Sequence, residues 1–500
     1  MSEEHKLFVR RIGVVGVAQT FQSMKGLILL PVFTKILGST DYGVWSLILT
    51  TIAVLQPFIL LGLPDAVLRF LSPLTKDKIV QGVITIILVV LLTSSILAFL
   101  FFLSSDILSQ TVFKEPSAVN VIRLAVPYMI LDSVNMIILG SFRVFGMIKK
   151  YAVVLIMKTS LEITFIVFFI VSGYGLNGVL YSVIINESIT LLVMLYFIFS
   201  YAGVTKPNFS ILKPYLVFGL PLIPITLARF VFDSSDRYVI GFFLGPEKVG
   251  IYSAAYGIGV IPLVLSTYLV YVLGPTVYNL YDNGLIEKAK MYLSYSWKYL
   301  LMLSIPSAFG LTILSRPILL NMTTANFVTD GVYIIPLVVL CIVFWGMEQI
   351  FGVSLLIFKR RKIFVVAFIC GAIINLALNI VLVPQYGIIA AAVTTLIAYA
   401  LITTIIGYTS RRYFTFHLNL LFVVKSILSA VVMTAAIWLI NPLTIPGIIL
   451  SIILGICIYF CVLILLKGFR KGEIQTIFDI VGLRKLYEKI NLFSNRIKKQ

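Results

Sequence analysis

Long apolar segments alternate with short polar connections along the whole chain. Most of these segments reach the roughly 20 residues that a helix needs to cross a bilayer. The first segment is too long for a signal-peptide core and lacks a small-residue cleavage site, so we expect it to remain as a helix. The pattern predicts fourteen transmembrane helices: Ile12–Thr34, Gly43–Leu63, Val80–Leu103, Val119–Gly140, Tyr151–Val171, Gly178–Tyr201, Tyr215–Ile240, Gly250–Gly274, Tyr292–Leu314, Val332–Phe358, Ile363–Pro384, Gly387–Thr409, Leu421–Ile440 and Pro446–Leu466.

One short phrase occurs twice, each time between two long apolar segments. Leu37–Ser46 reads LGSTDYGVWS and Leu244–Ser253 reads LGPEKVGIYS, so both copies have the form L-G-x4-G followed by a β-branched residue, an aromatic residue and serine. A membrane chain built from two equivalent halves is typical of a transporter whose substrate site lies between the halves. Further landmarks recur at a similar offset, namely Pro127 with Pro336 and Tyr174–Gly175 with Tyr386–Gly387.

The repeat predicts an all-α polytopic membrane protein with two pseudo-equivalent lobes of six helices each. We place the first lobe at residues 1–207, the second at 208–412 and two additional helices at 413–467. Because six is an even number, both lobes have the same orientation and are related by an axis along the membrane normal. Residues 468–500 form a basic tail that predicts either an amphipathic helix on anionic lipid or a solvated extension. Its apolar face would hold Leu486, Ile490, Phe493 and Ile497.

Composition and charge exclude two broad classes of protein. With 60% hydrophobic and 12% charged residues, the chain is not a soluble globular protein, and its short connections leave no room for a soluble catalytic domain. The formal charge of +19 invites a nucleic-acid partner, but the basic residues fall in alternate loops. This is the positive-inside pattern, which predicts a multi-pass protein of the cell membrane with both termini in the cytoplasm and no nucleic-acid partner.

Charged side chains inside the seventh segment are the first candidates for a binding site. Charges at mid-bilayer cost roughly 2.5–3.5 kcal/mol on insertion scales, so each one needs a reason. Here Arg229, Asp233, Asp236 and Arg237 lie within about a quarter of a turn, and two pairs have salt-bridge spacing. One interpretation is a cationic cavity for an anionic substrate, in which the two aspartates hold the arginines. The alternative is that the charges neutralise each other and only hold helices together.

The first segment carries a matching polar stripe. Shifting the seventh segment back by the repeat offset places Arg229 on Gln22, and Gln19 and Lys25 lie beside it. Two polar stripes at the same depth on pseudo-equivalent helices predict a shared central cavity, with Lys25 and Arg229 as its cations.

A second polar set lies in the first half and is a candidate cation site. Carboxylates with amide neighbours in a dry interior can take up Na⁺ or a proton. The alternative is a structural pair of Lys158 with Glu162 at i,i+4, with the other acids bonded to neighbouring helices. The set comprises Asp132, Asn135, Glu162, Asn186 and Glu187.

Several motifs are missing from the sequence. It has no G-x4-G-K-[ST] phosphate loop, no D-x-D pair on a predicted outer loop and no cluster of histidine or cysteine residues. We therefore expect a transporter rather than an enzyme, with no cofactor and with Na⁺ or H⁺ as the candidate coupling ion.

Specific stretches of the sequence resemble a known family. Asp236–Tyr256 is similar to the central signature of polysaccharide and oligosaccharide-lipid flippases, as are Leu30–Gly38 with Tyr42–Gly43 and Gly62–Leu63 followed by Arg69. These flippases belong to the multidrug/oligosaccharidyl-lipid/polysaccharide exporter superfamily.

The resemblance implies two lobes arranged as a V around a cationic cavity. It also implies transfer of polyprenyl-linked sugars from the cytoplasmic to the outer leaflet for cell-surface polysaccharide or glycan synthesis. The basic residues that the family keeps in and just after its first helix map to Lys25 and Lys35, and Arg69 joins the cavity set through its signature. Relatives that flip the peptidoglycan precursor have an arginine where this chain has Leu29. We therefore do not assign the peptidoglycan precursor as the substrate of this chain.

The expected partners are a lipid-linked oligosaccharide, membrane lipids and other polysaccharide-assembly proteins. One rival function is a cation-coupled exporter of small amphipathic cations, which a cavity with unpaired acids would favour. Another is a non-transporting scaffold that recruits polysaccharide enzymes through the basic tail.

Overall fold

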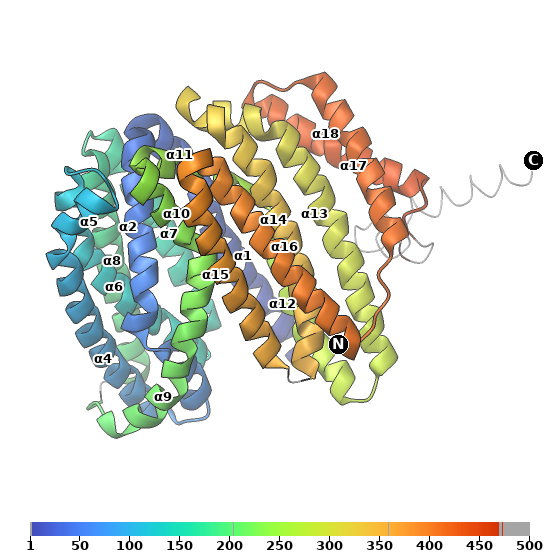
Figure 1. Ribbon diagram of the computed structural model, residues 1–500. Helices are drawn as coiled ribbons and strands as arrows, with labels where there is room; N and C mark the ends of the chain where they lie inside the picture. The colour runs from blue at the N-terminus through green and yellow to red at the C-terminus, as the bar shows by residue number, and fades with distance from the viewer. Residues whose placement is uncertain (1–2, 204, 359, 470–472, 474–500) are drawn as a thin grey trace, which may run out of the picture.

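The chain forms a bundle of long helices lying side by side (Figure 1). The computed structural model describes residues 3–203, 205–358, 360–469 and 473, and the described residues form helices, turns and loops without a strand. The all-α membrane architecture predicted from the sequence is therefore confirmed.

The first half of the chain contains α1 to α8. Two π-helical turns, Phe33–Leu37 and Val67–Leu71, follow α1 and α3. The helices are α1 (Glu3–Val32), α2 (Gly38–Leu60), α3 (Leu63–Ala66), α4 (Lys76–Leu103), α5 (Ser105–Thr111), α6 (Ala118–Val144), α7 (Ile148–Val171) and α8 (Gly175–Ala202).

The remainder contains α9 to α18. These are α9 (Leu212–Gly219), α10 (Ile223–Leu244), α11 (Pro246–Gly259), α12 (Leu263–Asp282), α13 (Ile286–Met322), α14 (Ala325–Ile357), α15 (Arg361–Tyr386), α16 (Ile388–Tyr413), α17 (Leu420–Ile440) and α18 (Ile445–Leu465).

Each predicted transmembrane segment coincides with one helix or with two consecutive helices. By length and apolar composition, eleven helices of the described residues qualify as spans, and a bent pair at α9–α10 is the twelfth. One of the eleven is the 48-residue run Gly13–Leu60. At about 1.5 Å per residue it is more than twice as long as the roughly 30 Å hydrocarbon core, so it holds two of the predicted spans. The pair α11–α12 corresponds to the remaining predicted segment.

Glycine and proline set the breaks between these helices. Gly38 separates α1 from α2, and Gly245 separates α10 from α11, with φ angles of 84° and 86° that favour glycine. Pro221 and Pro224 flank the junction of α9 and α10, where the proline rings prevent a regular helical hydrogen-bond ladder.

The helices pack mainly with others of their own half. In the first half α1 packs on α7, α7 on α8, and α6 on both α8 and α4. In the second half α14 packs on α13 and α16, while α15 packs on α16 and α10. Helices α17 and α18 pack on each other and on α13, at the edge of the molecule (Figure 1).

The two copies of the repeated phrase face each other and join the halves. An added Cβ at Gly43 of α2 would overlap the carbonyl oxygen of Pro246 on α11, and one at Gly250 would overlap that of Ser39. Ser46 and Ser253, which are equivalent in the repeat, share a hydrogen bond with an Oγ–Oγ distance of 2.7 Å. We call this contact between α2 and α11 the seam. At the seam, the two copies of the repeated phrase pack directly against each other.

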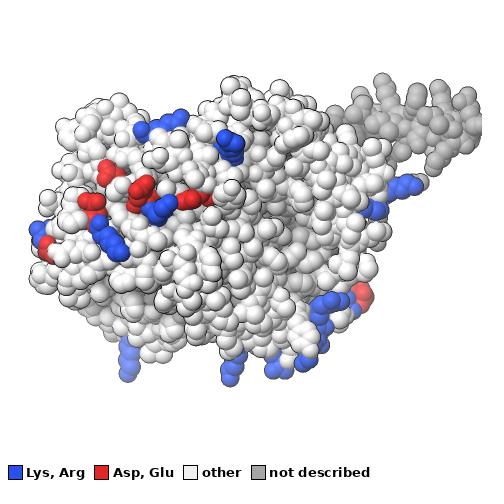
Figure 2. Space-filling view, turned by 45° about the horizontal axis from the view of Figure 1, so that its top comes forward, with Lys and Arg blue, Asp and Glu red and all other residues white. Residues whose placement is uncertain are grey.

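Charged side chains lie mostly at the two ends of the bundle (Figure 2). Figure 2 shows mainly basic residues along the lower edge, with acidic surface beside them at its right end, whereas acidic and basic residues mix on the upper face. A broad uncharged band separates the two, as expected for a surface that contacts lipid. The apolar face predicted at residues 486–497 lies outside the described residues.

Candidate functional site

The polar stripe of α1 is exposed along most of its length. Gln19 and Gln22 have exposed side chains, although they lie in the middle of a span. Lys25 is half-buried because its Nζ forms an ion pair with Oε1 of Glu162 on α7, at 2.7 Å. A predicted cavity cation and a predicted cation-site acid are therefore partners of each other.

The matching stripe on α10 begins with Arg229. Its side chain is exposed and forms no ion pair or hydrogen bond with any other described residue. Its guanidinium still attracts the carboxylates of Asp233 and Glu348 through space. Asp233 does not form the predicted ion pair with Arg229, since its Oδ1 accepts a hydrogen bond from the Tyr399 hydroxyl of α16 at 3.1 Å.

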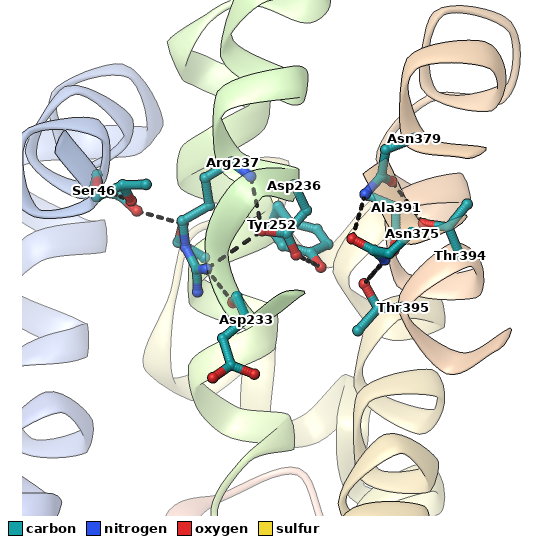
Figure 3. Close-up of polar contacts among 12 residues, drawn as sticks. Ser46, Asp233, Asp236, Arg237, Tyr252, Asn375, Asn379, Ala391, Thr394 and Thr395 are labelled. Carbon is teal, nitrogen blue, oxygen red and sulfur yellow. Dashed lines mark hydrogen bonds and ion pairs between the residues drawn. The ribbon is translucent and has the colours of Figure 1, made fainter. Parts of the chain in front are cut away.

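Asp236 and Arg237 pair with each other and with residues of the neighbouring helix α11 (Figure 3). Asp236 is buried and accepts hydrogen bonds from the Tyr252 hydroxyl and from the backbone N–H of Arg237. The Arg237 guanidinium pairs with Asp236 at 3.5 Å and lies over the ring of Tyr256, 4.8 Å from its centroid. Arg237 meets Asp233 only at the backbone carbonyl oxygen, at 3.4 Å. These two charges hold α10 against α11, which corresponds to the alternative interpretation of the stripe.

The candidate cation site of the first half forms a network around Lys158. Lys158 Nζ lies 2.7 Å from Glu187 Oε1 and 3.6 Å from Asp132 Oδ1. Asn135 donates to Glu187 Oε2 at 2.7 Å, and Gln56 donates to Asp132 at 3.2 Å. The predicted i,i+4 pair of Lys158 with Glu162 is not formed, because Lys158 turns toward α8 and α6.

This network has consequences for cation binding. Each acid of the set is paired with a lysine, so a metal ion there would have to displace an ammonium group. The described residues contain no group of three His, Cys, Asp or Glu side chains that could hold a metal ion. Asn186 is fully buried, and neither its oxygen nor its nitrogen has a hydrogen-bond partner among the described residues.

Lys35 and Arg69, which the sequence placed in the cavity set, lie apart from Lys25 and Arg229. Lys35 is exposed in the π-helical turn that ends α1, roughly 15 Å along the axis from Lys25 by helical rise. Arg69 lies 4.7 Å from the ring centroid of Phe218 on α9, where Gly62 and Gly219 also bring the two halves into contact.

The second half contains buried polar groups that the sequence-based site set did not include. Glu348 of α14 is 1% exposed, and its Oε1 has no hydrogen-bond partner among the described residues. Figure 3 shows a further chain of buried groups between α15 and α16. In it Asn375 donates to Thr395 at 3.2 Å and Thr394 donates to Asn379 at 2.6 Å. The sequence did contain signals that could have identified these groups. Glu348 is a lone acid in an apolar run, and Asn375 and Asn379 are spaced i,i+4.

Comparison with known proteins adds a family assignment. The family model described as "Polysaccharide biosynthesis protein" matches residues 8–280, which is more than half of the chain. A curated relative from Haloferax volcanii, described as "Probable low-salt glycan biosynthesis flippase Agl15", is 23% identical over 234 residues. That alignment covers 47% of this chain and 49% of the relative, so the chain spans about half the length of the curated relative it matches.

Solved structures share the fold. The structure described as "Lipid II flippase MurJ, inward closed conformation" has a TM-score of 0.73 at 17% identity and covers 89% of this chain and 97% of its own. An inward-facing multidrug resistance MATE family transporter of the MOP superfamily has a TM-score of 0.66 at 15% identity, covering 78% and 94%. Both likenesses concern the fold, which is that of the exporter superfamily expected from the sequence.

Proposed function

Because the chain belongs to the polysaccharide biosynthesis protein family, we propose that it is a transporter that flips lipid-linked oligosaccharide across a membrane. The substrate would be a polyprenyl phosphate or pyrophosphate carrying sugars, moved from the cytoplasmic to the outer leaflet for surface polysaccharide or glycan synthesis. The single observation that carries the proposal is the exposure of Arg229, a cation without an ion-pair partner among the described residues, in the middle of a broken span. An exposed charge at this depth faces water or an anionic ligand rather than lipid.

The proposed binding step uses Arg229 and Lys25 together. Arg229 provides a planar fork of donors that suits phosphate oxygens. The ammonium group of Lys25 is paired with the Glu162 carboxylate in this structure. A substrate phosphate would replace that carboxylate as the partner of Lys25. The exposed amides of Gln19 and Gln22 would then hydrogen-bond to sugar hydroxyls. The charge of the phosphate would be matched without stranding Lys25 unpaired in the interior.

We propose that translocation proceeds by alternating access. The lobes at residues 1–207 and 208–412 would rock against each other, so that the seam, which joins them through equivalent residues of the repeat, opens and closes. Both termini would be cytoplasmic, as the basic lower edge in Figure 2 supports. Other polysaccharide-assembly proteins would supply and consume the substrate.

The coupling ion belongs to the same proposal. The Lys158 ammonium lies between Asp132 and Glu187. Protonation of one of these carboxylates would therefore leave Lys158 paired with the other alone. Because a bound ammonium disfavours a metal ion in the same space, this network supports H⁺ rather than Na⁺ as its ion.

One observation favours a second candidate, the cation-coupled exporter. Glu348 is a buried carboxylate with one oxygen that has no hydrogen-bond partner among the described residues, and the fold is shared with a MATE transporter. An amphipathic cation could neutralise such a group.

The decisive test is transport in liposomes. Purified protein would be reconstituted with a labelled polyprenyl-pyrophosphate oligosaccharide, and the accessibility of the label would be followed from outside. We expect Lys25→Ala and Arg229→Ala to abolish translocation while the folded protein stays in the membrane. The matched control is Lys149→Ala, which removes an exposed cation at the start of α7.

Near-normal translocation by both variants would contradict the cavity assignment. In the same vesicles, collapsing the proton gradient should slow transport, whereas collapsing the Na⁺ gradient should not. Export of a small organic cation, with no movement of several lipid-linked sugars, would favour the second candidate.

A further inference from the structure

A pocket lies at the edge of the molecule, away from the central site. It has a volume of about 510 Å³ and is lined by the first turns of α13, the connection between α16 and α17, and Glu473. Helix α13 begins at the same end of the molecule as α1 (Figure 1). The pocket does not contain any residue of the central polar stripes, so it can be considered independently of the proposed translocation.

Lys298 is the buried cation of this pocket. The residue is 5% exposed, and its Nζ lies 5.0 Å from the ring centroid of Phe422 and 5.4 Å from that of Phe469. A buried ammonium between two aromatic rings needs an anionic partner, because desolvation without one is strongly unfavourable. In this structure the partner is Glu473, with Oε2 at 2.6 Å.

The anionic partner, Glu473, is distant in sequence from Lys298. Glu473 follows the end of α18 at Leu465, and its carboxylate reaches back to α13 across the sequence. The Glu473 side chain lines the pocket and leaves its volume of about 510 Å³ open. The rest is lined by further donors, including Lys290, Tyr295, His417 and Asn419. This set offers more hydrogen-bond donors than one carboxylate requires.

The donor set suits a phosphate group. A phosphate presents three or more acceptor oxygens and binds several cationic and hydroxyl donors at once. Lys290 already pairs with exposed Glu287, at 2.7 Å, and could turn to a stronger anion. With Glu473 in place the pocket's lysines and acids balance, and without Glu473 one positive charge remains over.

The surroundings of the pocket identify the source of the phosphate. Leu420 and Leu421, which open α17 beside the pocket, are 66% and 65% exposed. Met291 and Tyr292 of α13 are also exposed. In a membrane protein such exposed apolar faces contact lipid, and the pocket lies where they meet the charged end of the bundle. A lipid headgroup in the pocket would have its acyl chains beside the exposed Leu420 and Leu421 of α17.

We propose that this pocket binds the phosphate headgroup of an anionic membrane lipid, and that Glu473 is a tethered competitor for Lys298. The lipid phosphate takes the position of the Glu473 carboxylate. Binding then releases Glu473 from Lys298, so the pocket couples lipid composition to this ion pair.

The experiment uses the full chain in mixed micelles of phosphatidylcholine and phosphatidylglycerol. Native mass spectrometry would measure the fraction of protein that retains phosphatidylglycerol as its content is varied. Glu473→Gln keeps the side-chain shape and removes the competing charge. We expect it to lower the half-saturating phosphatidylglycerol content about tenfold, the factor that corresponds to losing one hydrogen bond between charged groups.

Two further variants make the result specific. Lys298→Gln combined with Glu473→Gln should lose the enhanced retention, and it avoids leaving either charge buried alone. The matched control is Asp330→Asn, which, like Glu473→Gln, removes one negative charge, here from an ion pair of the same 2.6 Å length with Lys248 elsewhere in the molecule. It should retain phosphatidylglycerol as the unmodified chain does.

Unchanged or reduced retention in folded Glu473→Gln would overturn the proposal, since the ion pair would then be only a structural clamp. Displacement of phosphatidylglycerol by inorganic phosphate at millimolar concentration would overturn the lipid as the source. Equal enhancement in Asp330→Asn would show that the effect is general electrostatics and would also overturn it.

Discussion

Arg229 and Arg237 lie on the same helix, yet their surroundings give them different roles. Arg237 is enclosed by Asp236, Tyr252 and Tyr256, whereas Arg229 is exposed and has no ion-pair partner among the described residues. A buried pair with full hydrogen bonding holds helices in place, and its charge is not available to a ligand. At the residue scale, exposure therefore distinguishes a cation whose charge is available to a ligand from one whose charge is not.

The Lys25–Glu162 pair yields a prediction at this scale. Glu162→Gln removes the carboxylate that competes for Lys25, so the ammonium becomes available to an anion. We expect the variant to bind a soluble pyrophosphate-linked oligosaccharide about tenfold more tightly, consistent with the loss of one charge-assisted contact. Isothermal titration calorimetry of the purified variant measures this change.

The control for that variant is Lys25→Gln, alone and combined with Glu162→Gln. The single variant should bind more weakly than the unmodified chain, and the combined variant should not show the gain. An equal gain in the combined variant would contradict a role for Lys25 in phosphate binding.

The partners of the buried charges show how far sequence reasoning reaches. Spacing identified Lys158, Asp132 and Glu187 as unusual inside apolar spans, because a charge in the bilayer must have a reason. It proposed Glu162 as the partner of Lys158, since i,i+4 spacing describes only neighbours on one helix. The actual partners come from α8 and α6, and that choice depends on how the helices rotate against each other. Helix rotation is set by packing across the bundle, which the periodicity of one segment does not contain.

At the scale of elements, the sequence revealed the repeat but not the contact that its two copies make with each other. The phrase L-G-x4-G predicted two equivalent halves, and its glycines Gly38 and Gly245 do end helices with matching backbone angles. That Gly43 and Gly250 are also the points of close approach between α2 and α11 required the structure. A glycine within a helix signals close packing without naming the partner.

The seam gives a prediction for these elements. Gly250→Ala places a methyl group against the carbonyl oxygen of Ser39, so α2 and α11 must separate locally. We expect the variant to unfold at lower temperature, with a destabilisation of about 1–3 kcal/mol, as for an overpacked core. Thermal unfolding in detergent measures the shift.

Gly140→Ala is the matched control for the seam, because an added Cβ at Gly140 of α6 would meet no atom within 4 Å. It should leave the unfolding temperature unchanged or raise it slightly, since alanine favours helices. Equal destabilisation by both substitutions would show that the seam is not a site of close packing.

The whole molecule combines an uncharged outer band, charged ends and buried polar groups in each half. The same repeat that relates the halves also places equivalent residues on the contact between them. Ser46 and Ser253 thus lie at a contact that would open and close if the halves moved against each other. Alternating access requires this contact to change, whereas a static scaffold does not.

Cross-linking the two serines tests that motion. Their hydroxyl oxygens lie 2.7 Å apart, so Ser46→Cys with Ser253→Cys places two thiols in contact. The native Cys341, Cys370, Cys457 and Cys461 would be replaced by serine in the same background. Oxidation should stop translocation of a labelled lipid-linked oligosaccharide in liposomes, and a reductant should restore it. Each single-cysteine variant, which cannot form the cross-link, should transport equally under both conditions. Full transport by the oxidised, cross-linked protein would mean that the seam stays closed throughout the cycle, and the moving contact would have to be sought elsewhere, for example where Gly62 meets Gly219.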